Sequence, residues 1–271
     1  MKLINLLKQD TPSLSFEVFP PKVDAKFDSV KAATEEIARL KPAFVSVTYG
    51  AGGGTSKYTL DIAKNIKDQY DVSTLAHLTC VMALRGDIPE NMDLSHQENW
   101  HYHHAIDLIR ELKESGADFC IGGACYPEIH PESSNQKEDI RFLKEKVDAG
   151  CEFLTTQMFF DNNLLYNFLY KIREAGITVP VVAGIMPITN ANQVERALKL
   201  SGSHVPQRFK SLVDKFGSDP AAMKQAGIAY ATDQIIDLYA NNITKDHVYS
   251  MNKPDVAEKI QRNLSDILGK N

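Results

Sequence analysis

Glu17 is the residue of this chain best suited to proton transfer. It lies alone in an apolar, strand-like stretch that two prolines end, Ser15–Pro21. Proline cannot donate to a sheet ladder and keeps the preceding residue extended, so the strand ends at Phe19 and Glu17 lies near its carboxyl end. Burial raises the pKa of a carboxyl group, which produces an acid that works near neutral pH. Taken alone, the stretch also fits a glutamate that faces solvent or pairs with a lysine.

Polar residues also follow most of the other apolar, strand-like runs. They are Thr48 and Tyr49, His77, Arg85 with Asp87, Tyr126 and His130, Gln157, and Lys253. Each could also have only a structural role, since a single buried histidine or glutamine usually just forms hydrogen bonds within the core. In barrels of alternating strands and helices, however, the carboxyl ends of all strands meet at one mouth, where active sites lie. Six or more polar strand ends on one rim therefore predict a binding or catalytic site.

The elements that must position these residues alternate regularly. Amphipathic helices end at Gly116, Gly150 and Gly176, because glycine readily adopts the left-handed conformation that closes a helix. The runs that follow are nearly all apolar, as in parallel strands covered on both faces. Eight strands are predicted, at 15–19, 44–49, 75–81, 82–85, 119–124, 153–158, 179–185 and 247–251. The sequence therefore predicts an α/β fold, a (βα)8 TIM barrel that forms one domain over residues 1–271.

One joint departs from this alternation, between Val81 and Met82. The runs Leu75–Val81 and Met82–Arg85 follow each other with no turn or helix between them. Neighbouring parallel strands need a crossover of about a dozen residues or more, so a direct connection is sterically impossible. We expect a crossover helix to be missing from the printed sequence here. The alternative is a true deletion, which would damage the barrel.

Composition and charge exclude several classes of partner. The net charge is −5, lysine and arginine are scattered, and no apolar run could span a bilayer, so neither nucleic acid nor a membrane is expected. Residues 1–8 are too short and too interrupted for a signal peptide, which predicts a cytoplasmic protein. The four cysteines have no CxxC spacing and are predicted to be reduced core thiols. The histidines at 96, 101, 103 and 104 match no zinc spacing, so we expect a surface loop with a helix start and no metal.

The chain carries a set of motifs that resembles one enzyme family. They are, in order, SFEVFPP, FVSVTYGAGG, AHLTC, ALRGD, CYPEIHPES, KVDAG, TTQMFFD and GIMPI. Together they resemble 5,10-methylenetetrahydrofolate reductase of the bacterial single-domain kind, over most of the chain from Ser15 to Lys253. The resemblance implies a barrel that binds FAD at the strand carboxyl ends. It also implies that NADH or NADPH reduces methylenetetrahydrofolate to methyltetrahydrofolate in two alternating half-reactions. We further expect a homo-oligomer.

Carried over position by position, the resemblance implies roles for individual residues. Glu17 would protonate the folate and open its five-membered ring, and Asp87 would lie beside the flavin and the pterin. The positions matching folate contacts are Glu17, Asp87, Gln157, Gln193 and Lys253. Those matching flavin contacts are Thr48, Tyr49, Ala51, His77, Arg85, Gly86, Asp87, Ala105, Tyr126, His130, Ser133, Asp139 and Lys146, the last being suited to the pyrophosphate.

Two residues depart from the family's pattern. Glu145 stands where a basic residue is common, which would weaken phosphate contact locally. Lys253 replaces a common arginine and so loses bidentate binding to a carboxylate.

Two other functions stay open. A barrel lyase or aldolase needs a Schiff-base lysine inside a strand, whereas Lys22 and Lys57 fall in loops or helix starts. The chain could also be a catalytically inactive flavin-binding or interaction barrel, above all if the crossover is truly deleted.

Overall fold

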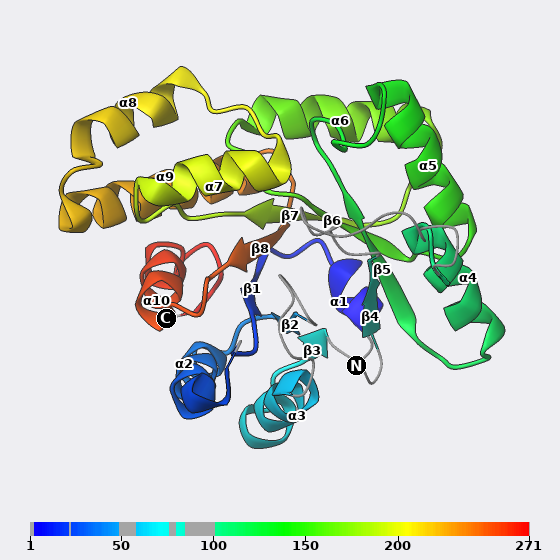
Figure 1. Cartoon of the computed structure of the whole chain (residues 1–271), viewed down its shortest axis with the longest axis horizontal. Coiled ribbons are helices and arrows are strands. Elements are labelled where there is room, and N and C mark those ends of the chain that lie inside the picture. Colours follow the sequence, from blue (N-terminus) through cyan, green and yellow to red (C-terminus); the bar gives the residue numbers. More distant parts are fainter. Residues whose placement is uncertain (1–2, 22, 49–57, 76–79, 85–100, 271) are drawn as a thin grey trace.

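Short parallel strands form the inner wall of the molecule. The computed structural model describes residues 3–21, 23–48, 58–75, 80–84 and 101–270. Its strands pair in the order β3-β2-β1-β8-β7-β6-β5-β4, and every pair is parallel. They are β1 Ser13–Val18, β2 Val45–Val47, β3 Thr74–Leu75, β4 Cys80–Ala83, β5 Cys120–Cys125, β6 Phe153–Thr156, β7 Val181–Ile185 and β8 Lys245–Tyr249. The sheet curls into a nearly closed ring with helices around it (Figure 1), so the predicted α/β barrel is confirmed.

The helices surround this ring and connect its strands. They are α1 Leu3–Leu7, α2 Phe27–Arg39, α3 Thr59–Tyr70, α4 Ala105–Glu114, α5 Gln136–Asp148, α6 Asn162–Glu174, α7 Asn192–Ser201, α8 Gln207–Phe216, α9 Pro220–Ala240 and α10 Pro254–Asn263, with a 3-10 turn at Asp24–Lys26. Gly116, Gly150 and Gly176 follow α4, α5 and α6 with φ angles of 71°, 117° and 76°. The predicted glycine helix ends are therefore confirmed, whereas α1, α7 and α8 were not predicted.

Strand β1 shows how the sequence sorts its two faces. Leu14, Phe16 and Val18 are buried in the main core cluster, which also contains Ile37 of α2 and Ile260 of α10. Burying a large apolar side chain stabilises a fold by about 1.5–3 kcal/mol, so these alternate residues fix the outer face of the strand. Ser15 and Glu17 must then face the inside of the barrel.

The amino-terminal end of the barrel is closed by α1. Its Leu3, Ile4 and Leu7 share a buried cluster with Phe44 and Phe153, which lie at or next to the amino ends of β2 and β6. Figure 1 shows α1 inside the ring of helices, near β4 and β5. The open end of the barrel is therefore the carboxyl-terminal mouth, where Glu17 lies.

The predicted joint at Val81 and Met82 differs from the structure. Both residues belong to β4, where they pair in succession with Ile121 and Gly122 of β5. Strand β3 ends at Leu75, so only residues 76–79 separate it from β4. The predicted strand boundary was wrong because the seven residues 75–81, which contain no turn residue, were interpreted as one strand. The prediction that a crossover is missing stands, because the four residues 76–79 are too few for the crossover of about a dozen residues that neighbouring parallel strands need.

The structure describes most of the cysteines and histidines about which the sequence made predictions. Cys120, Cys125 and Cys151 are free and buried, as predicted for core thiols. His101, His103 and His104 lead into α4, where the Asp107 carboxylate accepts the backbone N–H groups of His103 and His104. His96 lies outside the described residues. Among the described helices, none is long and apolar enough to cross a membrane.

Candidate active site

Glu17 lies on the inner wall of the barrel, one residue before β1 ends. It is in register with Ser46 of β2 and with Tyr249 of β8. The residue keeps some exposed surface at the mouth. Protein atoms nevertheless surround its carboxyl group closely enough that burial raises its pKa to about 7. Near neutral pH this carboxyl group therefore exists in both protonation states, as a proton donor must.

Tyr249 forms the wall next to Glu17. Its hydroxyl donates a hydrogen bond to the backbone oxygen of Thr156, 2.6 Å away on β6. To reach β6 the side chain passes β7 at Gly184, where a Cβ atom would come within 2.4 Å of the hydroxyl oxygen. Burial raises the pKa of Tyr249 well above its ordinary value, so the hydroxyl keeps its proton. It acts as a neutral donor beside the glutamate.

His247 lies one layer below, toward the closed end. Its Nδ1 is 2.7 Å from the Ser15 hydroxyl and its Nε2 is 2.8 Å from the Ser46 hydroxyl, while its ring stacks on Phe44 at 5.2 Å. Burial lowers the pKa of His247 to about 3. The ring is therefore neutral at physiological pH, and it joins β8, β1 and β2 beneath the carboxyl group.

The turn after β8 is bound to the end of β1. Asn252 accepts the backbone N–H of Phe19 at 3.0 Å and donates to the oxygen of the same residue at 2.8 Å. Ser250 donates to the backbone oxygen of Glu17 at 2.6 Å. Met251 and Asn252 both have positive φ angles, 54° and 53°, a conformation that asparagine tolerates better than most residues. The turn that carries Lys253 is thus fixed against the strand that carries Glu17.

Lys253 and Gln193 come together across the β7 and β8 loops. The Lys253 ammonium donates to the Thr189 hydroxyl at 2.8 Å, and the Gln193 side-chain oxygen accepts the Thr189 N–H at 2.9 Å. Burial and the nearby Lys224 lower the pKa of Lys253. Two predicted substrate residues therefore share one partner, at the same end of the barrel as Glu17.

Another group of polar residues lies between β5 and α5. The Tyr126 and His130 rings meet edge to face with 4.6 Å between centroids. Asp139 accepts the backbone N–H of His130 at 3.1 Å and the hydroxyl of Ser133 at 3.4 Å. Tyr126 also lines a narrow crevice together with Gln157, which follows β6. The structure thus brings four of the predicted flavin residues together and places one predicted folate residue beside them.

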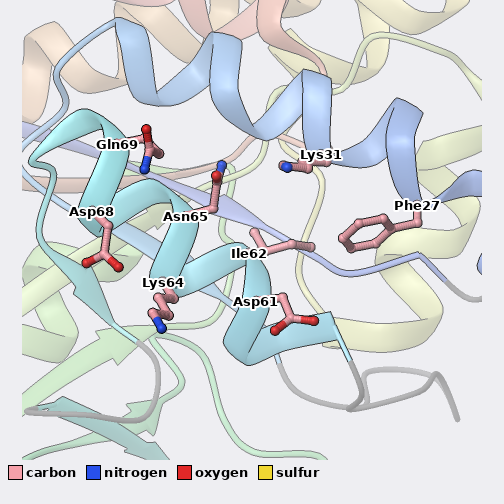
Figure 2. A pocket seen from close by; sticks show the side chains of 8 residues that line it. All are labelled: Phe27, Lys31, Asp61, Ile62, Lys64, Asn65, Asp68 and Gln69. Carbon is pink, nitrogen blue, oxygen red and sulfur yellow. The ribbon is translucent and has the colours of Figure 1, made fainter.

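A larger pocket lies elsewhere. Figure 2 shows it between α2 and α3, outside the barrel wall, with a volume of about 260 Å³. Its lining residues are Phe27, Lys31, Asp61, Ile62, Lys64, Asn65, Asp68 and Gln69. They include none of the predicted site residues. This groove is therefore not the candidate active site.

The motif resemblance is matched by comparison with known proteins. The family model described as methylenetetrahydrofolate reductase matches residues 2–82 and 81–265. The chain belongs to the methylenetetrahydrofolate reductase family. It is 32% identical over 274 residues to the 5,10-methylenetetrahydrofolate reductases of Pectobacterium carotovorum and of Escherichia coli K12, covering 93% of this chain and 90% of each relative. It is 30% identical to methylenetetrahydrofolate reductase (NADH) 1 of Arabidopsis thaliana, covering 97% of this chain and half of that relative.

A solved structure extends the likeness to the fold. An uncharacterized protein from Clostridium thermocellum, described as binding two copies of 5-methyl-5,6,7,8-tetrahydrofolic acid, has a TM-score of 0.69 and 12% identity. The match covers 98% of this chain and 99% of that protein.

The family match also locates the missing crossover. Its two pieces meet at residues 81–82, where the sequence predicts the absent helix. The alignment to the Pectobacterium reductase has 274 positions, more than the 271 residues of this chain, although only 93% of the chain is aligned. The relative therefore contains residues that this chain lacks.

Several family-matched positions lie outside the described residues. They are Tyr49, Ala51, His77, Arg85, Gly86 and Asp87. Ala105 is described at the start of α4. Thr48 follows β2, and its hydroxyl is buried with no hydrogen-bond partner in the described part of the chain.

The methylenetetrahydrofolate reductase motif KVDAG begins at Lys146 on α5, whose ammonium donates to the Ala124 oxygen at 2.8 Å. Burial lowers the pKa of this lysine. Glu145, the residue that departs from the family's pattern, pairs with Arg141 at 2.9 Å on the exposed face of the helix.

Sequence reasoning missed the residues that support Glu17. Tyr249, His247, Ser250 and Asn252 lie within or just after β8, in a segment singled out only for Lys253. One signal was available. A histidine and a tyrosine alternate with apolar residues in β8, and with period two both must face the side of the sheet opposite Val248.

Proposed function

We propose that this chain reduces 5,10-methylenetetrahydrofolate to 5-methyltetrahydrofolate, with a bound FAD that NADH or NADPH reduces first. The family membership supports the reaction. The observation that carries the proposal is Glu17, whose carboxyl group lies on the inner wall of the mouth with a pKa raised to about 7. A reductase of this kind needs such a proton donor, whereas a barrel that only binds a flavin does not.

In this proposal Glu17 is the general acid. It donates its proton to a nitrogen of the five-membered ring of the folate, the adjoining carbon–nitrogen bond breaks, and the freed carbon accepts hydride. Charge then remains on the Glu17 carboxylate until it is reprotonated. Because the protonated form is the active one, this step favours pH values below about 7.

The described residues fit the flavin that the family implies. Among the described residues, the buried hydroxyl of Thr48 has no hydrogen-bond partner, and a ligand could use it. Tyr126 and His130 offer ring edges and faces, and Lys146 offers a cationic donor suited to a pyrophosphate. When bound, the flavin would accept hydride from the nicotinamide and deliver it to the folate. The chain itself supplies orientation, the proton and charge near the ring.

The folate side of the proposed site combines an amide and a cation. Gln157 stands beside Tyr126 in the crevice, with its side-chain oxygen accepting the backbone N–H of Met158 at 2.9 Å. Its amide nitrogen is then oriented away from that bond and suits an acceptor on the pterin. Lys253 suits a carboxylate of the folate, as a point charge rather than a bidentate partner.

The missing crossover favours one other function. A barrel without the β3–β4 helix could still bind flavin through α5 and its preceding loop and yet be inactive. Spectra of the purified protein separate the readings. A yellow protein whose flavin band is bleached anaerobically by NADH or NADPH supports an active nicotinamide half-reaction and excludes a lyase. Methyltetrahydrofolate formation then excludes the inactive barrel, and its absence would refute the reductase.

Glu17→Gln tests the acid directly. The amide keeps the shape and loses the proton, so flavin reduction by NADH should persist while the folate half-reaction slows by about 10²- to 10⁴-fold. Glu152→Gln is the control, because Glu152 pairs with Lys113 at 2.9 Å before β6, at the closed end of the barrel. Loss of both half-reactions in Glu17→Gln alone would overturn the assigned role.

A further inference from the structure

Tyr249 joins two sides of the mouth that otherwise belong to different strands. On β8 it is in register with Glu17 of β1, so the two side chains stand next to each other on the inner wall. Its hydroxyl does not bond to a neighbouring strand. It crosses β7 and donates to Thr156 on β6 at 2.6 Å.

Gly184 makes this crossing possible. A Cβ atom at that position would lie 2.4 Å from the Tyr249 hydroxyl oxygen and 2.3 Å from the Thr156 oxygen. The Gly184 N–H also donates to the Thr156 side-chain hydroxyl at 2.8 Å. Thr156 is thus held from β7 and from β8 at once, at the last residue of β6.

The residue after Thr156 is Gln157. Its backbone N–H donates to Cys125 at 2.7 Å, so the end of β6 is held from β5 as well. Gln157, followed by Met158, then lines the crevice beside Tyr126. The Tyr249 hydroxyl is therefore the described side-chain link between the Glu17 side of the mouth and the strand end that presents Gln157.

We infer that Tyr249 is a positioning residue that sets the distance between the Glu17 carboxyl group and a folate held by Gln157. The inference rests on the proposed function. The acid and the substrate amide stand on strands separated by β8 and β7, so small independent movements of β6 would alter proton transfer without breaking either residue's own contacts. Rates of proton transfer depend steeply on such distances, and a misplacement of about 1 Å can cost up to about a hundredfold.

Tyr249→Phe tests the inference by removing one oxygen and leaving the ring. We expect the folate half-reaction to slow about tenfold, while the dissociation constant for 5-methyltetrahydrofolate, measured by calorimetry, changes less than about twofold. Flavin reduction by NADH should stay within about twofold of the unmodified protein. A slower rate with unchanged binding is the mark of misplacement, since general structural damage would weaken binding and both half-reactions together.

Tyr230→Phe is a matched control. The Tyr230 hydroxyl also donates to a backbone oxygen at 2.6 Å, that of Phe160, but it does so from α9 and outside the site. This variant should lose a similar free energy of unfolding and keep both half-reactions. Gly184→Ala is the second test, because its Cβ atom would push apart the Tyr249 hydroxyl and the Thr156 oxygen, and it should slow the same half-reaction.

The outcomes separate the two proposals. An unmodified protein that forms no methyltetrahydrofolate refutes the proposed function. An active protein whose Tyr249→Phe variant keeps the full folate half-reaction, or loses both half-reactions equally, refutes the positioning role. Solved structures of the unmodified protein and the variant give a readout without turnover. We expect Gln157 to shift relative to Glu17, and an unchanged separation would also refute the inference.

Discussion

The β8–β1 side of the mouth and the β3–β4 side differ in how firmly hydrogen bonds hold their strands together. Around Glu17, Ser250 and Asn252 bind the backbone of β1, and His247 joins β1 to β2. On the opposite side, β3 has two residues and lies beside β4 with no backbone pairing between them in the described structure. The first side is fixed by many hydrogen bonds, and the second lacks the helix that would complete it.

The difference shows that the acid and the barrel closure are separable features. Among the described residues, the hydrogen bonds that support the Glu17 region come from β1, β2, β6, β7, β8 or the turn after β8. None of these bonds involves β3 or β4. The acid can therefore keep its environment in a barrel whose seam, the junction between β3 and β4, is incomplete. By contrast, several positions that the family resemblance assigns to the flavin lie near the seam in the sequence, namely His77, Arg85, Gly86 and Asp87.

Completing the seam should have a large effect on stability. We predict that inserting the crossover segment of the Pectobacterium reductase between β3 and β4 raises the free energy of unfolding by on the order of 3 kcal/mol, because a packed helix buries several apolar side chains. Urea unfolding measures this change. A glycine–serine insert of equal length is the control, and it should not stabilise the protein, since a loop contributes only closure entropy. Equal stability of the helix insert and the original chain would show that the seam is already complete.

The acid side can be tested through its dependence on pH. The folded-state pKa of Glu17 is raised, from 4.5 to about 7, so folding retains a proton that the unfolded chain releases. The stability contributed by neutral Glu17 is present below about pH 4.5 and is lost as the pH rises through about 7. Glu17→Gln cannot ionise, and its free energy of unfolding should exceed that of the unmodified protein by about 3 kcal/mol at pH 8 and match it below about pH 4.5.

Denaturant unfolding at the two pH values measures this difference and needs neither cofactor nor substrate. Glu145→Gln is the control, and its stability at pH 8 should differ little from that of the unmodified protein, because the exposed ion pair of Glu145 with Arg141 contributes little. A Glu17→Gln variant that is no more stable at pH 8 would mean that the carboxyl group is solvated in the folded protein.

The sequence predicted where strand β1 ends better than it predicted which residues of other strands would hold it in place. Prolines after Phe19 and the apolar run before Glu17 located the acid, because backbone rules that act over a few residues determine where a strand stops. Tyr249 and His247 could not be assigned in the same way. Their roles depend on which strands become neighbours, and β1 pairs with β8, which is more than two hundred residues away along the chain.

The seam shows the opposite limit. The steric rule for parallel strands detected the missing crossover from the sequence alone, and the two-part family match agrees with it. It did not locate the boundary, because the apolar run 75–83 has no turn residue to divide it. The structure ends β3 at Leu75 and begins β4 at Cys80. Hydrophobic pattern alone does not decide which part of a long apolar run pairs with a neighbour.

The smallest test concerns the turn after β8. Asn252→Gly keeps the positive φ angle without strain and removes both hydrogen bonds to Phe19, so the free energy of unfolding should fall by about 1–2 kcal/mol. Asn252→Asp retains the bond to the Phe19 N–H and should lose about half as much. Asn242→Gly is the matched control, with a φ angle of 62° and no side-chain hydrogen bond to any described residue, and it should change stability by less than about 0.5 kcal/mol. Because Asn252 precedes Lys253, its loss should also weaken binding of 5-methyltetrahydrofolate by about threefold, measured by calorimetry. Unchanged affinity in an Asn252→Gly variant that is clearly less stable would show that the turn supports the fold of β1 and not the placement of Lys253.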